Sequence, residues 1–350
     1  MKIGMIGLSG SGKTTLFSAL TRQITDSIQK GEDRIGTIPV PDPRVRDLAR
    51  IFNPKKIIYC QVTYLLPAST LHRPEHPGDP VSGSLIKEGD ALIHVIRNFK
   101  AAGMGNPTPL PDFLKLDQEM MLNDLMVVEK RLERILLDRK RGKKMDEEEF
   151  TALSSSAELL EKGIPLRRHL ELTQKPSLRG YPLMSAKPML VLFNNADDDE
   201  APPKMEEGPF FEEQMVIRGR LEQELSQMNE SDAELFAREF QIHDFAMERV
   251  IKKSFSLLGL ITFFTVLSSE VRAWTIPQGS TAQDAAGAIH SDMKKGFIRA
   301  EVLNHQELIN AGSYAEAKKR GIVRLEGKTY LVSDGDILQI RFNVTTVKDK

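Results

Sequence analysis

Cysteine, tryptophan and an excess of charge of either sign are nearly missing from this chain of 350 residues. Its one cysteine, Cys60, excludes an internal disulfide framework, and we expect no disulfide-linked partner. The formal net charge of −1 provides no global field directed at nucleic acid or at a membrane. The longest apolar run, residues 255–267, is interrupted by Gly259 and is too short to span a bilayer. No charged leader precedes the first apolar run, so we expect a cytoplasmic protein without membrane contact.

A phosphate-binding loop follows that first apolar run. Residues 7–14 read Gly-Leu-Ser-Gly-Ser-Gly-Lys-Thr and fit the pattern G-x-x-x-x-G-K-[ST]. A buried strand is predicted before the loop and a helix over residues 13–22 after it, which disfavours a glycine-rich turn that fits by chance. Glycines let the backbone wrap around phosphate oxygens, and the free N–H groups of the helix point at the same oxygens. We predict that the chain binds a nucleoside triphosphate.

Roles within the loop follow from phosphate chemistry. Lys13 is predicted to reach the β and γ phosphates and to support their transfer, and the Thr14 hydroxyl to hold Mg²⁺. The predicted cofactor is Mg²⁺, with ATP or GTP as the bound nucleotide. The residues predicted to contact the phosphates are Gly10, Ser11, Gly12, Lys13, Thr14 and Thr15.

A candidate base-reading loop follows the apolar run of residues 189–193. Asn194 and Asp197 fit Asn-x-x-Asp, the base-reading element of G-type NTPases, at the expected end of a strand. An aspartate there can accept both the N1–H and the N2 amino group of guanine, which adenine does not supply. Asn195 stands where G-type proteins usually carry lysine. We predict that Asn194, Asn195 and Asp197 contact the base.

Two long helices are predicted between these loops. Apolar residues recur at alternating steps of three and four over residues 121–135 and again over residues 150–164, which predicts an antiparallel coiled-coil hairpin. The turn between the helices is basic and could contact the phosphate backbone of RNA, or it could be a solvated turn. The cations of this basic tip are Arg139, Lys140, Arg141, Lys143 and Lys144.

Other parts of the chain give weaker signals. From about residue 271, short strands and glycine turns predict a compact α+β unit. A G-type NTPase would place its first switch within residues 25–34, and an Asp-x-x-Gly motif at the end of the strand predicted over residues 57–66. The chain has neither residue of that motif. His72 and His76 could bind a metal if they were helical, which the proline between them disfavours.

Together these features resemble the YchF or Obg-like ATPase family over nearly the whole chain. The last domain resembles a TGS domain, a ubiquitin-like β-grasp module, and the inserted hairpin matches as well. The resemblance rests on the phosphate loop and its helix, residues 7–20, and on the segments 39–44, 90–97, 270–275, 295–302 and 340–344.

The resemblance implies an α/β fold, in which a G-type P-loop NTPase domain carries an inserted antiparallel coiled-coil hairpin and a C-terminal β-grasp (TGS) domain. We expect the first part of the P-loop domain over residues 1–112 and its second part over residues 186–260. The helical insert would span residues 113–185 and the TGS domain residues 271–345.

The resemblance also implies ATP or GTP hydrolysis, ribosome association, and RNA contact by the hairpin and the TGS surface. We therefore expect a slow NTPase that acts as a nucleotide switch, works as a monomer, and has the ribosome or a structured RNA as its partner. A P-loop kinase is disfavoured, because the coiled coil and the TGS-like domain offer a macromolecular surface rather than a lid.

Several positions depart from the family pattern. Lys30 aligns with the threonine of the first switch, and Leu66 and Ser69 align with the aspartate and glycine of the second. Residues 103–106 lack a histidine that the family commonly has, and Asp197 replaces its usual glutamate. These departures favour a second interpretation, a nucleotide-binding ribosome or RNA adaptor whose catalysis has decayed.

Overall fold

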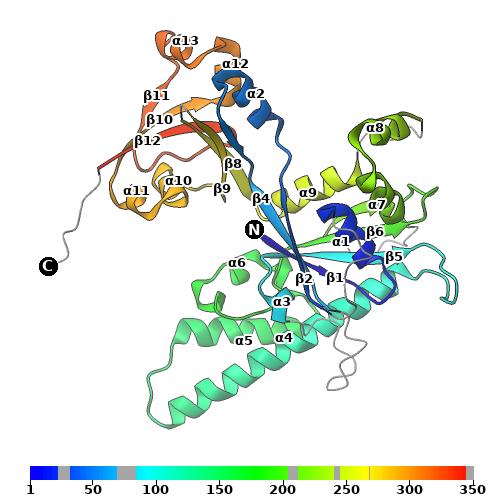
Figure 1. Ribbon diagram of the computed structural model, residues 1–350. Helices are drawn as coiled ribbons and strands as arrows, with labels where there is room; N and C mark the ends of the chain where they lie inside the picture. Colours follow the sequence, from blue (N-terminus) through cyan, green and yellow to red (C-terminus); the bar gives the residue numbers. More distant parts are fainter. Residues whose placement is uncertain (23–31, 69–83, 204–211, 240–244, 268, 344–350) are drawn as a thin grey trace. The chain divides into compact units, whose positions relative to one another are not determined.

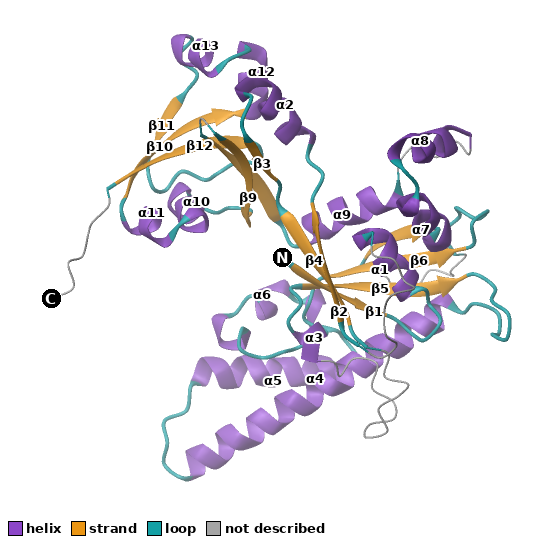
Figure 2. Ribbon diagram, in the orientation of Figure 1, coloured by secondary structure: helices purple, strands orange, loops and turns teal. Residues whose placement is uncertain are grey.

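The structure is a computed structural model that describes residues 1–22, 32–68, 84–203, 212–239, 245–267 and 269–343. The chain forms two compact units, Met1–Ile38 with Thr63–Val250 and Pro39–Val62 with Ile251–Lys350. A six-stranded sheet lies in each unit (Figures 1 and 2). Lys30, Ser69, His72 and His76 lie outside the described residues.

The sheet of the first unit has the strand order β2-β4-β1-β5-β6-β7, and the pairs from β4 to β7 are parallel. β5 and β6 are buried almost along their whole length, as their continuous apolar sequences predict. The carboxyl ends of parallel strands meet at one edge of a sheet, where binding loops gather. The strands are β1 (Lys2–Ile6), β2 (Arg34–Pro39), β4 (Gln61–Leu66), β5 (Ala91–Asn98), β6 (Met189–Asn195) and β7 (Glu213–Ile217).

The first unit also contains most of the helices, and α9 extends beyond Val250, the last residue of this unit. They are α1 (Lys13–Thr21), α3 (Ser84–Lys87), α4 (Pro109–Lys140), α5 (Glu147–Glu161), α6 (Leu170–Thr173), α7 (Gly219–Gln227), α8 (Glu230–Glu239) and α9 (Ala246–Leu257), with 3-10 helices η3 (Leu166–Arg168) and η4 (Pro176–Leu178).

The predicted coiled-coil hairpin is confirmed as α4 and α5, which lie side by side in Figure 1. Val128 and Ile135 of α4 pack in one apolar cluster with Leu153 and Leu160 of α5, which are the positions that the three-four pattern selected. The Asp146 side chain caps α5 by accepting hydrogen bonds from two backbone N–H groups of its first turn. Apolar packing along the seam therefore holds the hairpin together.

A buried ion triad lies at the base of the hairpin. Arg167 of η3 lies 2.7 Å from Asp117 of α4 and 2.6 Å from Glu212, which precedes β7. All three side chains are nearly inaccessible to solvent. Because loss of one partner would leave an uncompensated buried charge, the triad ties the root of the hairpin to the edge of the sheet.

The second unit contains a mixed sheet with the strand order β11-β10-β12-β8-β9-β3. This confirms the α+β character that the turn pattern predicted after residue 271. Its strands are β3 (Lys56–Ile58), β8 (Leu260–Val266), β9 (Glu270–Pro277), β10 (Phe297–Asn304), β11 (Arg324–Glu326) and β12 (Asp336–Phe342). Its helices are α2 (Pro43–Phe52), α10 (Ala282–Ile289), α11 (Ser291–Lys295), α12 (His305–Ala311) and α13 (Tyr314–Lys319).

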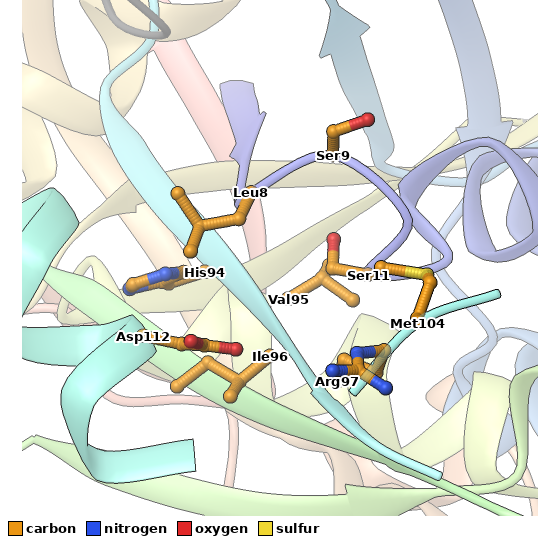
Figure 3. Close-up of a pocket in the computed structure, with 9 residues that line it drawn as sticks. All are labelled: Leu8, Ser9, Ser11, His94, Val95, Ile96, Arg97, Met104 and Asp112. Atoms are coloured by element: carbon orange, nitrogen blue, oxygen red, sulfur yellow. The ribbon is translucent and has the colours of Figure 1, made fainter. Parts of the chain in front are cut away.

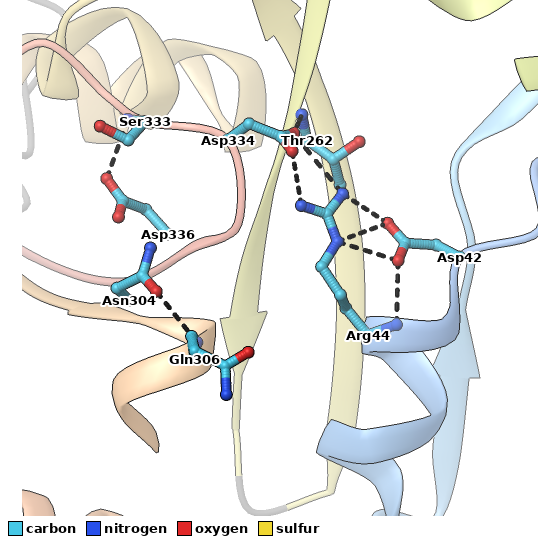
Figure 4. A network of polar contacts seen from close by, with 8 residues as sticks. All are labelled: Asp42, Arg44, Thr262, Asn304, Gln306, Ser333, Asp334 and Asp336. Atoms are coloured by element: carbon cyan, nitrogen blue, oxygen red, sulfur yellow. Dashed lines mark hydrogen bonds and ion pairs between the residues drawn. The ribbon is translucent and has the colours of Figure 1, made fainter. Parts of the chain in front are cut away.

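Residues 39–62 belong to the second unit, although they precede it by about 200 positions in the sequence. β3 pairs with β9 at the edge of the sheet. The Arg44 guanidinium forms ion pairs with Asp42 at 2.8 Å and with Asp334 at 2.6 Å (Figure 4). It also lies over the Phe264 ring. The division predicted from the sequence assigns this segment to the P-loop domain.

Within the described residues, we find no helix that combines the length and the apolar character needed to cross a membrane.

Candidate nucleotide-binding site

The phosphate loop leaves β1 at Gly7 and enters α1 at Lys13. Gly12 has φ +94°, which L side chains rarely adopt, and a Cβ there would lie 2.1 Å from the Nδ2 atom of Asn194. A Cβ at Gly7 would lie 2.3 Å from the backbone oxygen of Val95. The two outer glycines of the motif therefore let the loop pack closely against β5 and β6.

Lys13 folds back over this loop. Its Nζ donates hydrogen bonds to the backbone oxygens of Gly7 at 2.6 Å and Leu8 at 2.8 Å. Burial lowers the pKa of the Lys13 ammonium to about 8. A desolvated ammonium that donates to two carbonyl oxygens can donate to phosphate oxygens instead. The negative charge of the phosphates would then favour the protonated form of Lys13.

The first turn of α1 supplies the rest of the loop. The first intrahelical bond runs from the Leu16 N–H to the Gly12 oxygen, so helix geometry leaves the N–H groups of the preceding residues available to an anion. Thr14 is exposed and Thr15 half-buried at this end. The Ser11 hydroxyl is buried, and no described residue forms a hydrogen bond with it.

Asn194 connects the phosphate loop to the base loop. Its side-chain amide donates to the Ser11 oxygen at 3.0 Å, and its Oδ1 accepts from the Gly219 N–H at 2.9 Å. Both bonds are buried, so Asn194 braces three segments. The side chain of its neighbour Asn195 accepts from Asn98 at 2.8 Å and donates to the Ala201 oxygen at 2.7 Å. That either asparagine also touches a base stays a prediction.

Asp197 lies at the exposed rim of the base loop. Its side chain is 46% accessible and lies 3.9 Å from Arg220, which is 77% accessible. Arg218 links the same two segments, since it pairs with Glu200 at 2.9 Å and donates to the Asp197 backbone oxygen at 3.5 Å. The Asp197 carboxylate is therefore accessible to a base edge, but it lies in solvent beside Arg220.

Sequence reasoning missed Asn98 and the start of α7, where Arg218 is the N-cap residue and Gly219 and Arg220 begin the helix. This helix start follows β7, the strand that pairs with β6, so it lies at the same edge of the sheet as the base loop. Asn98 ends β5, which is the other neighbour of β6. The rule that loops at the carboxyl edge of a parallel sheet form the site could have indicated both.

Arg97 organises the loop between β5 and α4. Its guanidinium donates to the backbone oxygens of Phe99, Gly105 and Asn106 at 3.0 to 3.2 Å. This brings Met104 onto the phosphate loop, where a Cβ at Gly10 would lie 2.7 Å from the Met104 Cε. The loop that lacks the expected histidine therefore still contacts the predicted phosphate site.

A cavity of about 140 Å³ lies between the phosphate loop, β5 and the first turn of α4 (Figure 3). Lys13, Thr14 and the base loop are not among its lining residues, whereas Ser11 of the phosphate loop is, so the cavity adjoins the predicted nucleotide site. It is lined by Leu8, Ser9, Ser11, His94, Val95, Ile96, Arg97, Met104 and Asp112.

The basic tip lies at the far end of the hairpin. Gly142 takes φ +80° in the turn, and Lys143 pairs with Asp138 at 2.9 Å. The other four cations of the tip are exposed. The tip is thus a solvent-facing cationic surface, as the sequence indicated, and its RNA contact stays a prediction.

Known proteins resemble this chain over almost its whole length. The "Ribosome-binding ATPase YchF" of Bacillus subtilis (strain 168) is 34% identical over 363 residues, which cover 97% of this chain and 99% of that protein. This chain belongs to the YchF family. A second member, the protein of the same name from Pasteurella multocida (strain Pm70), is 32% identical over 361 residues, covering 98% and 99% of the two chains. The resemblance predicted from the sequence is therefore confirmed.

Two further comparisons agree with YchF membership. A family model described as YchF-GTPase_C, protein of unknown function (DUF933), matches residues 260–343. The "Structure of the Schizosaccharomyces pombe YchF GTPase" aligns with a TM-score of 0.74 at 23% identity, over 97% of each chain. That structure confirms the α/β fold.

Three of the expected departures from the family pattern lie in the described part of the chain: Leu66, residues 103–106 and Asp197. Leu66, which the resemblance aligns with the aspartate of the second switch, ends β4 and is only 4% accessible. No cluster of three or more His, Cys, Asp or Glu side chains that could hold a metal is found among the residues that the structure describes. In that part of the chain, Thr14 is the predicted metal ligand that remains.

Proposed function

We propose that this YchF-family chain binds ATP or GTP with Mg²⁺ at the phosphate loop, hydrolyses it slowly, and acts as a ribosome- or RNA-associated nucleotide switch in the cytoplasm. The observation that carries the proposal is the loop itself. Lys13 lies over a glycine turn at the N-terminus of α1, and Asn194 braces that turn against the base loop. A helix N-terminus with a desolvated lysine is suited to a polyphosphate.

The proposed contacts follow from this arrangement. Residues 10–15 would hold the phosphates, with Lys13 at the β and γ phosphates. Asp197 would face the base at the rim, and Asn194 and Asn195 would shape the base loop from behind. The P-loop, helical-insert and TGS division of the chain is part of the same proposal, with residues 39–62 packed on the C-terminal sheet.

The residues present fit a Mg²⁺ ion held chiefly by the nucleotide. Mg²⁺ commonly keeps several water ligands and binds through substrate phosphates and one or two protein oxygens. The exposed Thr14 hydroxyl at the start of α1 can supply one such oxygen. Leu66 offers none, so the protein would orient this ion less firmly than a site with an aspartate there.

Ribosome association is proposed from the relatives and from the hairpin. The curated relatives bear the name ribosome-binding ATPase. The hairpin of this chain ends in a tip with four exposed cations and one paired cation, which suits the phosphate backbone of ribosomal RNA. A monomer suffices for this function, because phosphate loop, base loop and hairpin all come from one chain.

Leu66 favours a second candidate, an adaptor that binds nucleotide without hydrolysing it. Phosphoryl transfer is driven by positioned charges around the γ phosphate and by an oriented nucleophile. A buried leucine at the second-switch position supplies neither. In that case the bound nucleotide would regulate ribosome binding through occupancy alone.

Two measurements on the same sample separate these candidates. Calorimetric titration with ATP and GTP in Mg²⁺ should show one site, whereas absence of binding would overturn both. Single-turnover hydrolysis without ribosomes should be no faster than about 0.01 s⁻¹, far below the 1–100 s⁻¹ typical of kinases. Acceleration by added ribosomes would support the switch, and hydrolysis absent with and without ribosomes would establish the adaptor. Turnover at the rate of a kinase would refute the proposed slow turnover.

A further inference from the structure

The cavity beneath the phosphate loop contains polar groups that no described residue satisfies. The two ring nitrogens of His94 and the Ser11 hydroxyl oxygen are buried without a hydrogen-bond partner there, and each residue is 1% accessible. Buried polar atoms are hydrogen-bonded in the great majority of cases. Two such side chains lining one cavity indicate that a molecule with donor and acceptor groups belongs between them.

Charge at the two sides of the cavity restricts what that molecule can be. Burial, together with the positive charges of Arg167 and Lys13, lowers the pKa of His94 to about 3, so the ring is neutral. The same two positive charges, which act on His94, disfavour a cation beside the ring. Asp112 lines the same cavity, where its carboxylate accepts a hydrogen bond from Thr108 at 2.9 Å and would repel an anion. An uncharged molecule avoids both costs.

The rest of the lining is mainly apolar, apart from Ser9 and Arg97, whose guanidinium donates to three backbone oxygens of its own loop. Leu8, Val95 and Ile96 form much of the lining, and Met104, whose side chain contacts Gly10, is 43% accessible and opens the cavity toward solvent. Figure 3 shows His94 and Asp112 on one side of the cavity and Ser11 and Met104 on the other. A volume of about 140 Å³ is close to that of an apolar cavity that holds benzene, about 150 Å³.

We infer that this cavity is a second ligand site, which takes a small uncharged molecule with a flat apolar body and one amide-like group. The apolar body would lie on Leu8, Val95 and Ile96. The amide-like group would donate to and accept from His94 and Ser11. The ligand would lie beside the nucleotide, because the cavity shares Ser11 with the proposed phosphate contacts but none of the residues proposed for Mg²⁺ or the base lines it.

Benzamide is a suitable probe, because benzamidine and benzoate are nearly the same shape with a positive and a negative charge. We expect benzamide to bind the full-length chain with a dissociation constant of about 1 mM, the range of a good fragment. Both charged analogues should bind at least tenfold more weakly. The readout is the ¹³C-methyl NMR signal of Met104, assigned with Met104→Leu, titrated with each compound. Equal binding of the three compounds, or no binding of benzamide, overturns the proposal.

Three variants test the residues. His94→Phe keeps an aromatic ring against Phe113, with which His94 stacks. Because it removes both ring nitrogens, it should weaken the affinity for benzamide at least tenfold. In case that core variant does not fold, Asp112→Asn at the half-buried side of the cavity gives an independent test. Asp112→Asn should leave the affinity for benzamide unchanged and raise the affinity for benzoate severalfold. Asp138→Asn at the far end of α4 is the matched control and should change none of the affinities. An affinity for benzoate that is the same in Asp112→Asn as in the wild type would contradict the inference that the Asp112 carboxylate repels an anion.

Competition separates this site from the nucleotide site. The Met104 shift with benzamide should persist in saturating MgATP, and ATP binding is measured on the same sample. Complete displacement of benzamide by ATP would place it in the nucleotide site and overturn the inference. A chain that fails to bind ATP but binds benzamide would refute only the proposed function.

Discussion

The phosphate loop and the tip of the hairpin are built from the same parts in opposite surroundings. Each is a turn with a glycine at positive φ, Gly12 in one and Gly142 in the other, next to lysine. Lys13 is desolvated, and its ammonium is held by two backbone oxygens. At the tip, Lys143 is 64% accessible even in its ion pair with Asp138, and the other four cations are exposed.

The difference shows that desolvation decides how strongly a single positive charge can bind a phosphate. In a desolvated loop, one ammonium interacts strongly with a nearby phosphate, because little water screens it. Exposed cations are screened by salt within about 10 Å, and each contributes little alone. We therefore expect large effects of single changes at the phosphate loop, and effects at the tip only when several charges are removed together.

The largest effect should come from Lys13→Ala. Removing the main countercharge should weaken ATP and GTP binding at least a hundredfold, measured by calorimetric titration. Lys143→Ala removes a lysine from the other glycine turn and is the matched control, which should leave nucleotide affinity unchanged. An unaltered affinity in Lys13→Ala would mean that the phosphate loop is wrongly assigned and that the two turns do not differ.

Asn194→Ala should have the next largest effect, because it loosens the loop without removing charge. The Ser11 oxygen and the Gly219 N–H would lose their buried partner, at a cost of roughly 1–3 kcal/mol. If this cost falls on the bound state, nucleotide affinity drops by about tenfold to a hundredfold in the same titration. The exposed Asn229→Ala is the control. Wild-type affinity in Asn194→Ala would show that the brace does not shape the site.

Nucleotide affinity should also depend on pH through Lys13. The pKa of Lys13 is lowered to about 8 by burial, so above pH 8 the empty loop has lost the proton that triphosphate binding requires. Affinity should therefore be constant between pH 7 and 8 and fall by about tenfold per unit above pH 8. Calorimetry at pH 9 in two buffers of different ionisation enthalpy would count the proton taken up. An affinity constant up to pH 10 would contradict this.

Neutralising the five cations of the tip together should weaken ribosome binding by about tenfold at 0.15 M salt and flatten its salt dependence, because each phosphate contact releases counterions. Pelleting with ribosomes at several salt concentrations measures both quantities. Nucleotide binding serves as the internal control and should not change. If variant and parent pellet alike at every salt concentration, the tip is a solvated turn.

The smallest effect concerns the choice between ATP and GTP at Asp197. The solvent accessibility of this side chain is intermediate between that of the buried phosphate loop and that of the exposed tip. Its carboxylate is about half accessible, so leaving it unpaired against adenine costs little. We expect ATP and GTP to compete for one labelled analogue within a factor of ten, with a slight preference for ATP. Asp197→Glu should change the ratio only a fewfold. A hundredfold preference for GTP that this variant abolishes would show that Asp197 reads guanine strongly.

Local patterns were enough to predict the phosphate loop and the hairpin. The loop is specified by glycines and lysine at fixed spacing, and the hairpin by apolar steps of three and four, so neighbours in sequence carry the information. The continuous apolar sequences of β5 and β6 indicate buried strands for the same reason. These elements were confirmed where the structure describes them.

Contacts between distant segments were beyond such reasoning. The Asn98–Asn195 bond joins residues 97 positions apart, and the Arg44–Asp334 pair joins residues 290 positions apart. In the sequence, His94 stands within the apolar run of residues 91–96, and only the assembled fold of α4 and the phosphate loop shows that its ring nitrogens have no described partner. Side-chain pairing of this kind depends on the assembled fold.

The placement of β3 beside β9 has a consequence for synthesis on the ribosome. Roughly 200 residues separate the two strands, and at about 5–20 residues per second they take on the order of 10–40 s to translate. β4 and β1 can pair in the meantime, since both are made early. Residues 39–62 therefore have no partner strand in the nascent chain until β9 has been synthesised. We expect a protease added to stalled ribosomes to cleave within residues 39–62 of short nascent chains but not of completed chains.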